Sequence, residues 1–407
     1  MWINLKFAMK EEKKHIWIYL FVSIQIAITF LIGFCCSIIF FNQIDIYKKF
    51  DEILSKDGKF ISSITGVRTP EQSIGSGASG ISILKDNLKK TDIIGCYNLL
   101  GDIENEEDKL EWNIIVYDDE FVEIHLPVLK EGKWFEKDKK SGVLRAVISD
   151  NNYGVGVGDF IILNPYDKKC SDIIVEIIGV LDENAQIIKF CASDNMVSCR
   201  NFIGNCDNVN ELPTLLLLQS DFFKIESGNW EELLWPAGMN FFIYDEDISL
   251  EERKSNEFFL DNYMNAQISE NISSVHQKSV EYICGNLMEV FPILLISILF
   301  SIVTTISISV LGAKYAAENY YIYYIIGMSH KKCLGIQFCI NLITLIVGFL
   351  LSSILIKIFI YPKMINNMSF DYRVLAVYFI SGGIWLIISF FIQKKVLNRL
   401  FYEEGLK

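Results

Sequence analysis

Four long apolar segments, one near the N-terminus and three near the C-terminus, constrain the fold of this chain most strongly. They are Ile16–Phe41, Phe291–Leu311, Leu334–Tyr361 and Val374–Ile392. A helix of about 20 apolar residues spans a hydrocarbon core of about 30 Å, so each segment is long enough to cross a membrane. The 407 residues are 51% hydrophobic, and these segments account for the excess over a soluble protein. We therefore expect a membrane protein with a large domain between its first two spans.

A secretory signal peptide is the competing interpretation of the first apolar segment, because lysines precede it. These are Lys6, Lys10, Lys13 and Lys14. The apolar stretch is too long for a signal peptide, however, and no small-x-small cleavage site follows Phe41. The pattern therefore favours a retained membrane helix.

Basic residues beside the spans predict the orientation of the chain, since they favour the cytoplasmic side. They precede the first span, separate the second from the third and follow the fourth, so we expect both termini in the cytoplasm. The expected segments are a cytoplasmic N-terminal helix (1–15), the first span (16–41), an extracytoplasmic domain (42–288), the second span (289–312), a cytoplasmic loop (313–333), the third span (334–361), an outer turn (362–373), the fourth span (374–392) and a cytoplasmic tail (393–407).

Short β-branched or aromatic runs alternate with turn residues in the extracytoplasmic domain, which is typical of strands. The expected strands are 112–117, Val143–Ile148, Phe160–Leu163, Ile173–Val180 and Leu215–Leu218. Helical patterns intervene at Ile44–Leu54 and Ser249–Met264. The predicted fold class is therefore an α+β membrane protein with four transmembrane helices and a large mixed α+β extracytoplasmic domain between helices 1 and 2.

Charge is distributed unevenly between these compartments. Residues 42–288 contain 43 acidic and 23 basic residues, a net charge of −20, whereas the remainder has a net charge of +7. An acidic outer domain could attract a cationic peptide, although the same charge also provides solubility. No basic segment is interleaved with aromatic residues, so we expect no nucleic-acid partner.

No motif for catalysis or cofactor binding stands in a suitable context. Gly75–Gly80 fits G-x-G-x-x-G by letters, but a polar stretch precedes it instead of a strand, so we interpret it as a loop. The sequence contains no P-loop, no H-E-x-x-H and no G-x-S-x-G. The four histidines are scattered. We expect no catalytic site, no cofactor and no metal site, and any ATP hydrolysis would occur in a separate subunit.

Ten cysteines are present, and six of them lie in the extracytoplasmic domain. Disulfides form on the oxidising side of a membrane, and six cysteines allow 15 pairings. Cys191, Cys199 and Cys206 lie close together in the sequence, which favours one bridge among them.

The second span carries small hydroxyl side chains at every fourth position. These residues, Ser297, Ser301, Thr305 and Ser309, share one face of a helix. Faces of small residues let membrane helices approach closely, so we expect a helix-packing contact within the chain or across a dimer. A hydrophilic path along the same face is the alternative.

The cytoplasmic loop between the second and third spans is rich in aromatic and apolar residues. Tyr320, Tyr321, Ile322, Tyr324 and Ile325 suit one face of a helix. Gly327 then ends that helix and Ser329 is placed to cap the next one. Exposed tyrosines at this point indicate a surface for a protein partner, whereas an interfacial belt against lipid headgroups is the alternative.

Several segments in this order resemble the FtsX-like permease family of MacB-type ABC transporters. They are Leu5–Lys10, Leu129–Phe135, Val147–Ser149, Val157–Asp159, Ile177–Val180, and Tyr323–Lys332 followed by an apolar span that contains Gly348. The chain departs from the family at two positions. The family's acidic residue before the loop glycine corresponds to Asn319, and a glutamate of the third span corresponds to a position near Asn341.

The resemblance implies a function and partners. The chain would be the permease subunit of an ABC transporter in a bacterial cell membrane, with 42–288 as a periplasmic-core-type domain and 313–333 as the coupling loop. A cytoplasmic ATPase would contact Tyr320, Tyr324, Gly327, Met328, Ser329 and His330, and a second permease subunit and membrane lipid would complete the assembly. Motion driven by ATP would serve export of, or resistance to, peptides or lipid-linked molecules.

Two other classes of function remain open at this point. One is a regulatory membrane receptor that senses an extracellular ligand or activates a cell-wall hydrolase without transporting anything. The other is an anchored extracellular hydrolase, which the missing catalytic motifs disfavour.

Overall fold

The fold is taken from a computed structural model. It describes residues 2–67, 81–99, 101–105, 108–136, 143–165, 172–183, 185–188, 197–205, 212–222, 233–236, 238–360 and 372–404. The glycine-rich loop Gly75–Gly80 and nearly all of the expected outer turn lie outside these residues.

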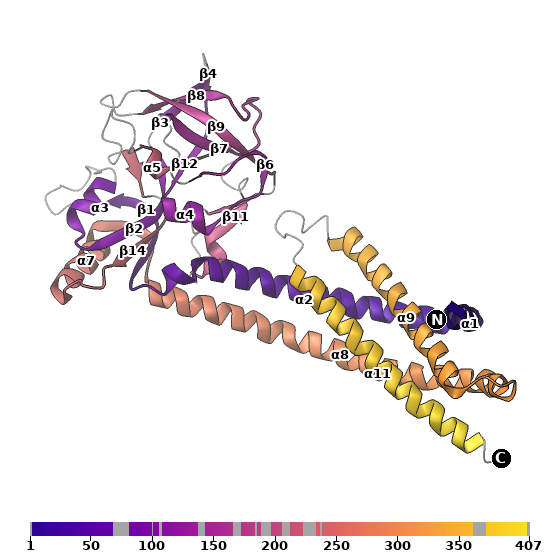
Figure 1. The fold of residues 1–407 in the computed structure, drawn as a ribbon. Helices are drawn as coiled ribbons and strands as arrows, with labels where there is room; N and C mark the ends of the chain where they lie inside the picture. Colours follow the sequence, from indigo (N-terminus) through magenta and orange to yellow (C-terminus); the bar gives the residue numbers. More distant parts are fainter. Residues whose placement is uncertain are drawn as a thin grey trace. The chain divides into compact units, whose positions relative to one another are not determined.

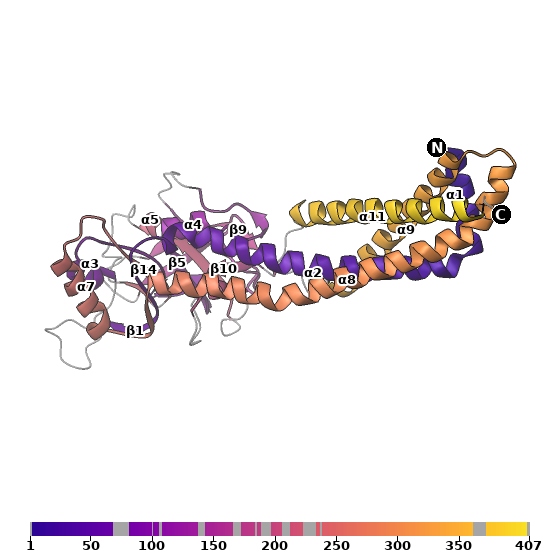
Figure 2. The same cartoon turned by 90° about the horizontal axis from the view of Figure 1, so that it is seen from below.

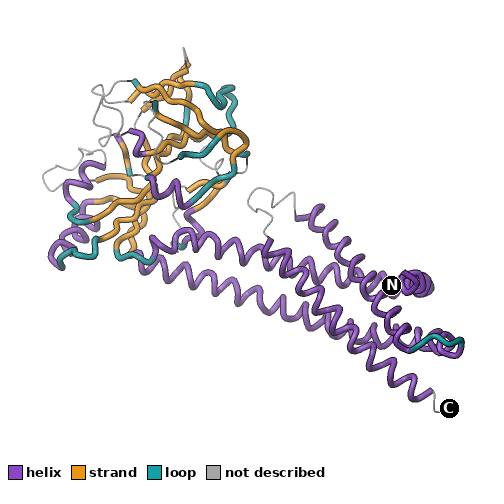
Figure 3. Tube along the Cα trace, in the orientation of Figure 1, coloured by secondary structure: helices purple, strands orange, loops and turns teal. Residues whose placement is uncertain are grey.

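The chain forms two compact units. A helical unit contains Met1–Asn42 and Gly285–Lys407, and a sheet unit contains Gln43–Cys284. Figure 3 shows helices throughout the first unit and strands concentrated in the second. The combination of a large sheet and long apolar helices confirms the predicted α+β fold class.

The sheet unit is built on one large mixed sheet, and Figure 1 labels many of its strands. In the described residues the order is β15-β1-β14-β2-β5-β12-β7-β9-β8-β3-β4, with β13 paired to β2, β6 paired to β9, and β10-β11 as a separate pair. The strands are β1 (Gly58–Val67), β2 (Thr91–Leu99), β3 (Gly101–Asn105), β4 (Asp108–Leu110), β5 (Asn113–Tyr117), β6 (Leu129–Gly132), β7 (Leu144–Ile148), β8 (Phe160–Pro165), β9 (Ile173–Leu181), β10 (Gln186–Ile188), β11 (Ile203–Asn205), β12 (Thr214–Leu218), β13 (Leu234–Trp235), β14 (Met239–Tyr244) and β15 (Met264–Asn271).

Strand β12 shows why an unbroken apolar run forms a strand here. Leu215 and Leu217 face one hydrophobic core, whereas Leu216 and Leu218 face another. Successive side chains of a strand point to opposite faces, so a strand covered on both faces is apolar throughout. The five strands expected from the sequence are confirmed as β5, β7, β8, β9 and β12.

Short helices accompany the sheet: α3 (Ile81–Asn87), α4 (Asp119–Ile124), η1 (Cys199–Phe202), α5 (Gln219–Phe222) and α7 (Leu250–Tyr263). Helix α7 confirms the expected helix and begins at a capping box of Ser249 and Glu252. In η1, Cys199 is buried and has a free thiol, so it takes no part in the bridge expected among Cys191, Cys199 and Cys206. Cys191 and Cys206 lie outside the described residues.

The described residues of the helical unit form six helical segments, and Figures 1 and 2 show helices of this unit from two sides. They are α1 (Trp2–Lys14), α2 (Ile16–Leu54), α8 (Ile272–Ile325), α9 (His330–Leu355), η3 (Ile356–Ile360) and α11 (Tyr372–Glu404). Four of the described helices, α2, α8, α9 and α11, are long and apolar enough to cross a membrane.

Helices α2 and α8 extend well beyond their apolar segments. The last part of α2 places Phe50, Ile53 and Leu54 in a core of the sheet unit, and the first part of α8 places Ile272 and Val275 in the same core. The hydropathy pattern therefore locates the end of the apolar segment but not the end of the helix. Both α2 and α8 contain residues of each unit.

Candidate functional site

The turn between α8 and α9 has a defined geometry. Gly327 has a φ of +96°, and the Met328 N–H donates to the Tyr323 carbonyl oxygen at 2.8 Å. This six-to-one hydrogen bond around a left-handed residue is a Schellman motif, which glycine adopts without steric cost. Tyr323 and Met328 also pack in the same hydrophobic cluster, as is common for that motif.

Ser329 occupies the N-cap position of α9. Its backbone is extended and its carbonyl oxygen accepts from the N–H groups of Lys332 and Cys333, but its side chain makes no capping hydrogen bond. The side chains of Tyr324 and His330 lie outside the described set. Backbone hydrogen bonds, and not a capping side chain of Ser329, therefore define the turn between α8 and α9.

Four of the described apolar side chains just before the turn are exposed, and we call them the turn surface. They are Tyr321, Ile322, Ile325 and Ile326, with exposures of 40%, 53%, 68% and 77%. Ile326 was not among the residues predicted for a partner contact. Exposed apolar side chains that cluster on one face mark contact surfaces for a partner or a membrane.

Tyr320 was predicted to be part of an exposed surface, and this is wrong. Its side chain is fully buried, and its hydroxyl donates to Gln337 Oε1 at 3.1 Å. Residues three apart lie on the same face of a helix, and Tyr320 and Tyr323 both pack into the buried cluster that contains Ile336. The neighbouring side chains of Tyr321 and Ile322 are exposed.

A buried carboxylate joins α1 to this end of α8. Glu11 is 3% exposed. Its Oε1 accepts from the Tyr323 hydroxyl at 2.9 Å and from Lys14 Nζ at 3.3 Å, and its Oε2 accepts from Asn319 Nδ2 at 3.0 Å. Lys14 Nζ also lies 3.5 Å from Asn319 Oδ1. Asn319 is thus half of an amide–carboxylate pair.

Apolar contacts surround this polar cluster. The Phe7 ring packs edge-on against Tyr323 with 5.7 Å between centroids, and Ala8 is buried against α9. Burial and the hydrogen bond to Glu11 raise the pKa of Tyr323 to about 12, so its hydroxyl remains a donor at neutral pH. Burial also raises the pKa of the neighbouring Glu12 to about 7.

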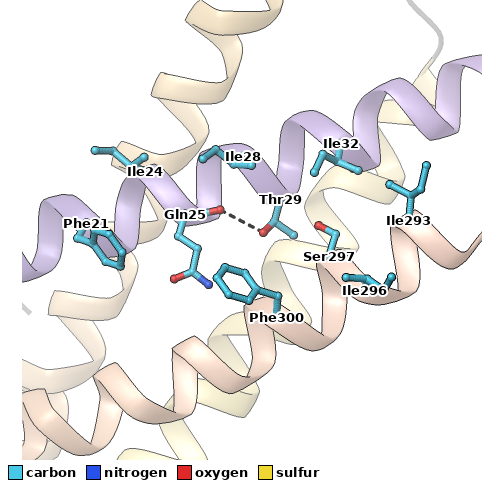
Figure 4. Close-up of a pocket in the computed structure, with 10 residues that line it drawn as sticks. All are labelled: Phe21, Ile24, Gln25, Ile28, Thr29, Ile32, Ile293, Ile296, Ser297 and Phe300. Atoms are coloured by element: carbon cyan, nitrogen blue, oxygen red, sulfur yellow. Dashed lines mark hydrogen bonds between the residues drawn. The ribbon is translucent and has the colours of Figure 1, made fainter. Parts of the chain in front are cut away.

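The membrane part of α8 borders a groove shared with α2. Its volume is about 440 Å³. Figure 4 shows Gln25 and Phe300 directed toward each other across it, with Thr29 and Ser297 nearby. The other lining residues are apolar: Phe21, Ile24, Ile28, Ile32, Ile293 and Ile296. Of the predicted packing face, Ser297 lines this groove and Ser301 is buried. The side chains of Thr305 and Ser309 lie outside the described set.

Helix α9 packs closely against both α2 and α11. A Cβ placed on Gly348 would lie 2.7 Å from Ile26 Cγ2, and Ser23 Oγ donates to the Thr344 carbonyl oxygen. On another side, Asn341 Nδ2 donates to Gln393 Oε1 at 2.6 Å, and Gln393 Nε2 donates to Asn341 Oδ1 at 3.0 Å. Asn341 and Gln393 are uncharged, so an inspection of the spans for ionisable residues did not predict this contact.

Buried ionisable groups in the sheet unit are paired within the fold. Arg145 forms a bidentate ion pair with Asp221, with distances of 2.8 and 3.0 Å. His125 Nε2 donates to the Gln186 carbonyl oxygen, and burial lowers the pKa of His125 to about 4. Among the described residues, no group of three His, Cys, Asp or Glu side chains is arranged to hold a metal ion.

Comparisons with known proteins gave two results. No protein-family profile matches the sequence. No curated protein sequence is similar to it either.

Solved structures are similar to part of the chain. One is the extracellular domain of the ABC-type transporter YknZ from Gram-positive bacteria, with 11% identity and a TM-score of 0.28 over 53% of this chain and 98% of that one. Another is the periplasmic region of MacB from Actinobacillus actinomycetemcomitans, with 13% identity and a TM-score of 0.29 over 57% of this chain and 96% of that one.

Proposed function

We propose that this chain is the permease subunit of an ABC transporter of the FtsX/MacB type, located in a bacterial cell membrane with both termini in the cytoplasm. A separate cytoplasmic ATPase binds and hydrolyses ATP. The chain transmits the resulting motion to an extracytoplasmic domain, the sheet unit. Its own chemistry is limited to binding and movement.

The turn surface is the observation that carries this proposal. Lysines beside it, Lys331 and Lys332, favour a cytoplasmic location, where water would otherwise cover Ile325 and Ile326. Covering apolar surface by a partner is favourable by about 25 cal/mol per Å². A Schellman turn also fixes the direction in which this surface is presented. A rigid apolar protrusion of this kind suits the groove of a partner protein.

Helix α8 is suited to transmit a displacement. It runs unbroken from Ile272 to Ile325 and has residues in both units. Only 6% of the most apolar stretch of α8 is buried within the chain. Few contacts within the chain therefore oppose movement of this helix. A second permease subunit and lipid would cover the remaining apolar surface of this helix.

The cargo class we propose is peptides or lipid-linked molecules, for export or resistance. The groove between α2 and α8 is almost entirely apolar and has the size of a small apolar side group or part of an acyl chain. The net charge of −20 in residues 42–288 would attract a cationic peptide to the extracytoplasmic domain.

Co-purification with candidate ABC ATPases tests the proposal, and the chain offers a matched pair of variants. Ile325 and Leu250 are both 68% exposed, but they lie at the turn and on α7 of the sheet unit. We expect Ile325→Asp to lower retention of the ATPase at least tenfold and Leu250→Asp to leave it unchanged. Equal retention by both variants would contradict the assigned contact, and absence of any ATPase bound to the native chain would contradict the function.

A further inference from the structure

Glu11 is the acidic side chain that ties α1 to the end of α8. Its two carboxylate oxygens receive three hydrogen bonds, two of them from residues more than 300 positions away in the sequence. A carboxylate buried to this degree is costly unless such partners compensate it. Removing the carboxylate would leave Asn319 and Tyr323 with unsatisfied donors.

The contact of Glu11 with α8 lies close, along the chain, to both the turn surface and the start of α2. Asn319 and Tyr323, which donate to Glu11, lie in the same two turns of α8 as the exposed residues Ile322, Ile325 and Ile326. Helix α1 ends at Lys14, and α2 begins two residues later at Ile16. The Ile18 and Tyr19 N–H groups bond to the His15 carbonyl oxygen, so little chain separates α1 from α2.

We propose that Glu11 is a positioning residue that holds the turn surface at a fixed place by binding the end of α8 to α1. A load applied to the turn surface would then reach the cytoplasmic ends of both α2 and α8, although an open groove separates these helices further along. The load-sharing role rests on the proposed function, whereas the contact itself is independent of any partner.

The geometry offers a swap variant as a sharp control. Lys14 Nζ approaches both Glu11 Oε1 and Asn319 Oδ1, so it can neutralise a carboxylate at either position. The double variant Glu11→Gln/Asn319→Asp exchanges the carboxylate and the amide and keeps the pair. Glu12→Ala removes an adjacent acidic residue for which no comparable set of hydrogen bonds exists in the described structure.

Amide hydrogen exchange of the full chain in lipid nanodiscs, without any ATPase, tests the contact. We expect Glu11→Ala to speed exchange of the amides of residues 319–326 at least tenfold. We expect the swap variant to restore native exchange, and Glu12→Ala to leave it unchanged. The amides of residues 336–345 in α9 serve as the internal reference, since local loosening leaves their exchange unaltered.

Unchanged exchange in Glu11→Ala, an equal effect of Glu12→Ala, or failure of the swap to restore protection would overturn the positioning role. These outcomes do not depend on the proposed function. A second readout with the bound ATPase separates the two claims: a loosened turn with normal ATPase activity and normal coupling would remove the load-sharing role while leaving the contact intact.

Discussion

Helices α8 and α9 meet at Gly327 and are both apolar enough to cross a membrane, yet they differ sharply in packing. The most apolar stretch of α9 is 39% buried within the chain, whereas the most apolar stretch of α8 is 6% buried. Helix α9 contributes Gly348 against α2 and Asn341 against α11. At its end, helix α8 is held within the helical unit through Asn319, Tyr320 and Tyr323.

This difference shows what holds helices together where water supplies no hydrophobic driving force. In lipid, association depends on close van der Waals contact and interhelical hydrogen bonds, since apolar side chains are equally well covered by acyl chains. Helix α9 has small residues and buried amides that provide both. Helix α8 has large exposed side chains, so it is the element best able to move.

Among the changes that test this difference in packing, Gly348→Leu should lower the stability of the chain most. The first atom of the new side chain would lie 2.7 Å from Ile26 Cγ2 and 3.2 Å from the Ser23 carbonyl oxygen. Overpacking of this kind costs about 1–3 kcal/mol. We expect the unfolding midpoint in detergent to fall accordingly.

Gly285 of α8 is the matched control for that change. A Cβ at Gly285 meets nothing within 4 Å, so Gly285→Leu should be neutral or slightly stabilising because leucine favours helices. Equal destabilisation by both variants would mean that the two helices do not differ in packing.

Breaking the Asn341–Gln393 pair should have the next largest effect. Interhelical hydrogen bonds in membranes contribute about 0.6 kcal/mol on average and up to about 1.7 kcal/mol. Because two bonds join these amides, we expect Asn341→Leu to destabilise the chain by about 1 kcal/mol. A double-mutant cycle with Gln393→Leu measures the coupling, and strict additivity would show that the pair contributes nothing.

The sequence predicted the parts of this molecule that follow from local pattern. Alternating or continuous apolar runs identified β5 and β12, and Gly327 identified the end of α8. Those signals depend on neighbouring residues in the chain. The α2 helix continued past its apolar segment because Asp45 and Lys48 end the hydropathy signal without ending the helix.

The remainder of the site depends on contacts between distant residues. Glu11 stands among lysines in a polar helix, a pattern typical of a solvated surface, and only its position beside Asn319 and Tyr323 gives it a role. The burial of Tyr320 likewise follows from α9 packing against one face of α8. No spacing rule along the sequence contains this information.

Replacing Gly327 with Ala should have a moderate effect on the junction of the two helices. The φ of +96° disfavours any residue with a Cβ, at a cost of about 1 kcal/mol, although the surrounding space is open. We expect a lower unfolding midpoint and reduced ATPase retention together. An unchanged midpoint would indicate that the turn does not adopt this conformation.

The smallest effect is expected for Ser297 of α8. Its side chain is half-buried in the groove beside Thr29, where only a hydroxyl would be lost. We expect Ser297→Ala to change stability by less than about 0.5 kcal/mol. A larger loss, measured by the same unfolding assay, would reveal a packing role for α8 within the isolated chain.

Site-specific photo-crosslinking tests the central claim most directly. Ile326, the most exposed residue of the turn surface, would be replaced by p-benzoylphenylalanine in cells that co-express the ATPase, and Leu250 of the sheet unit would be replaced in a parallel experiment. The account predicts an ultraviolet-dependent crosslink to the ATPase from position 326 and none from position 250. An ATPase that co-purifies with the chain but crosslinks from neither position, or from both equally, would contradict it.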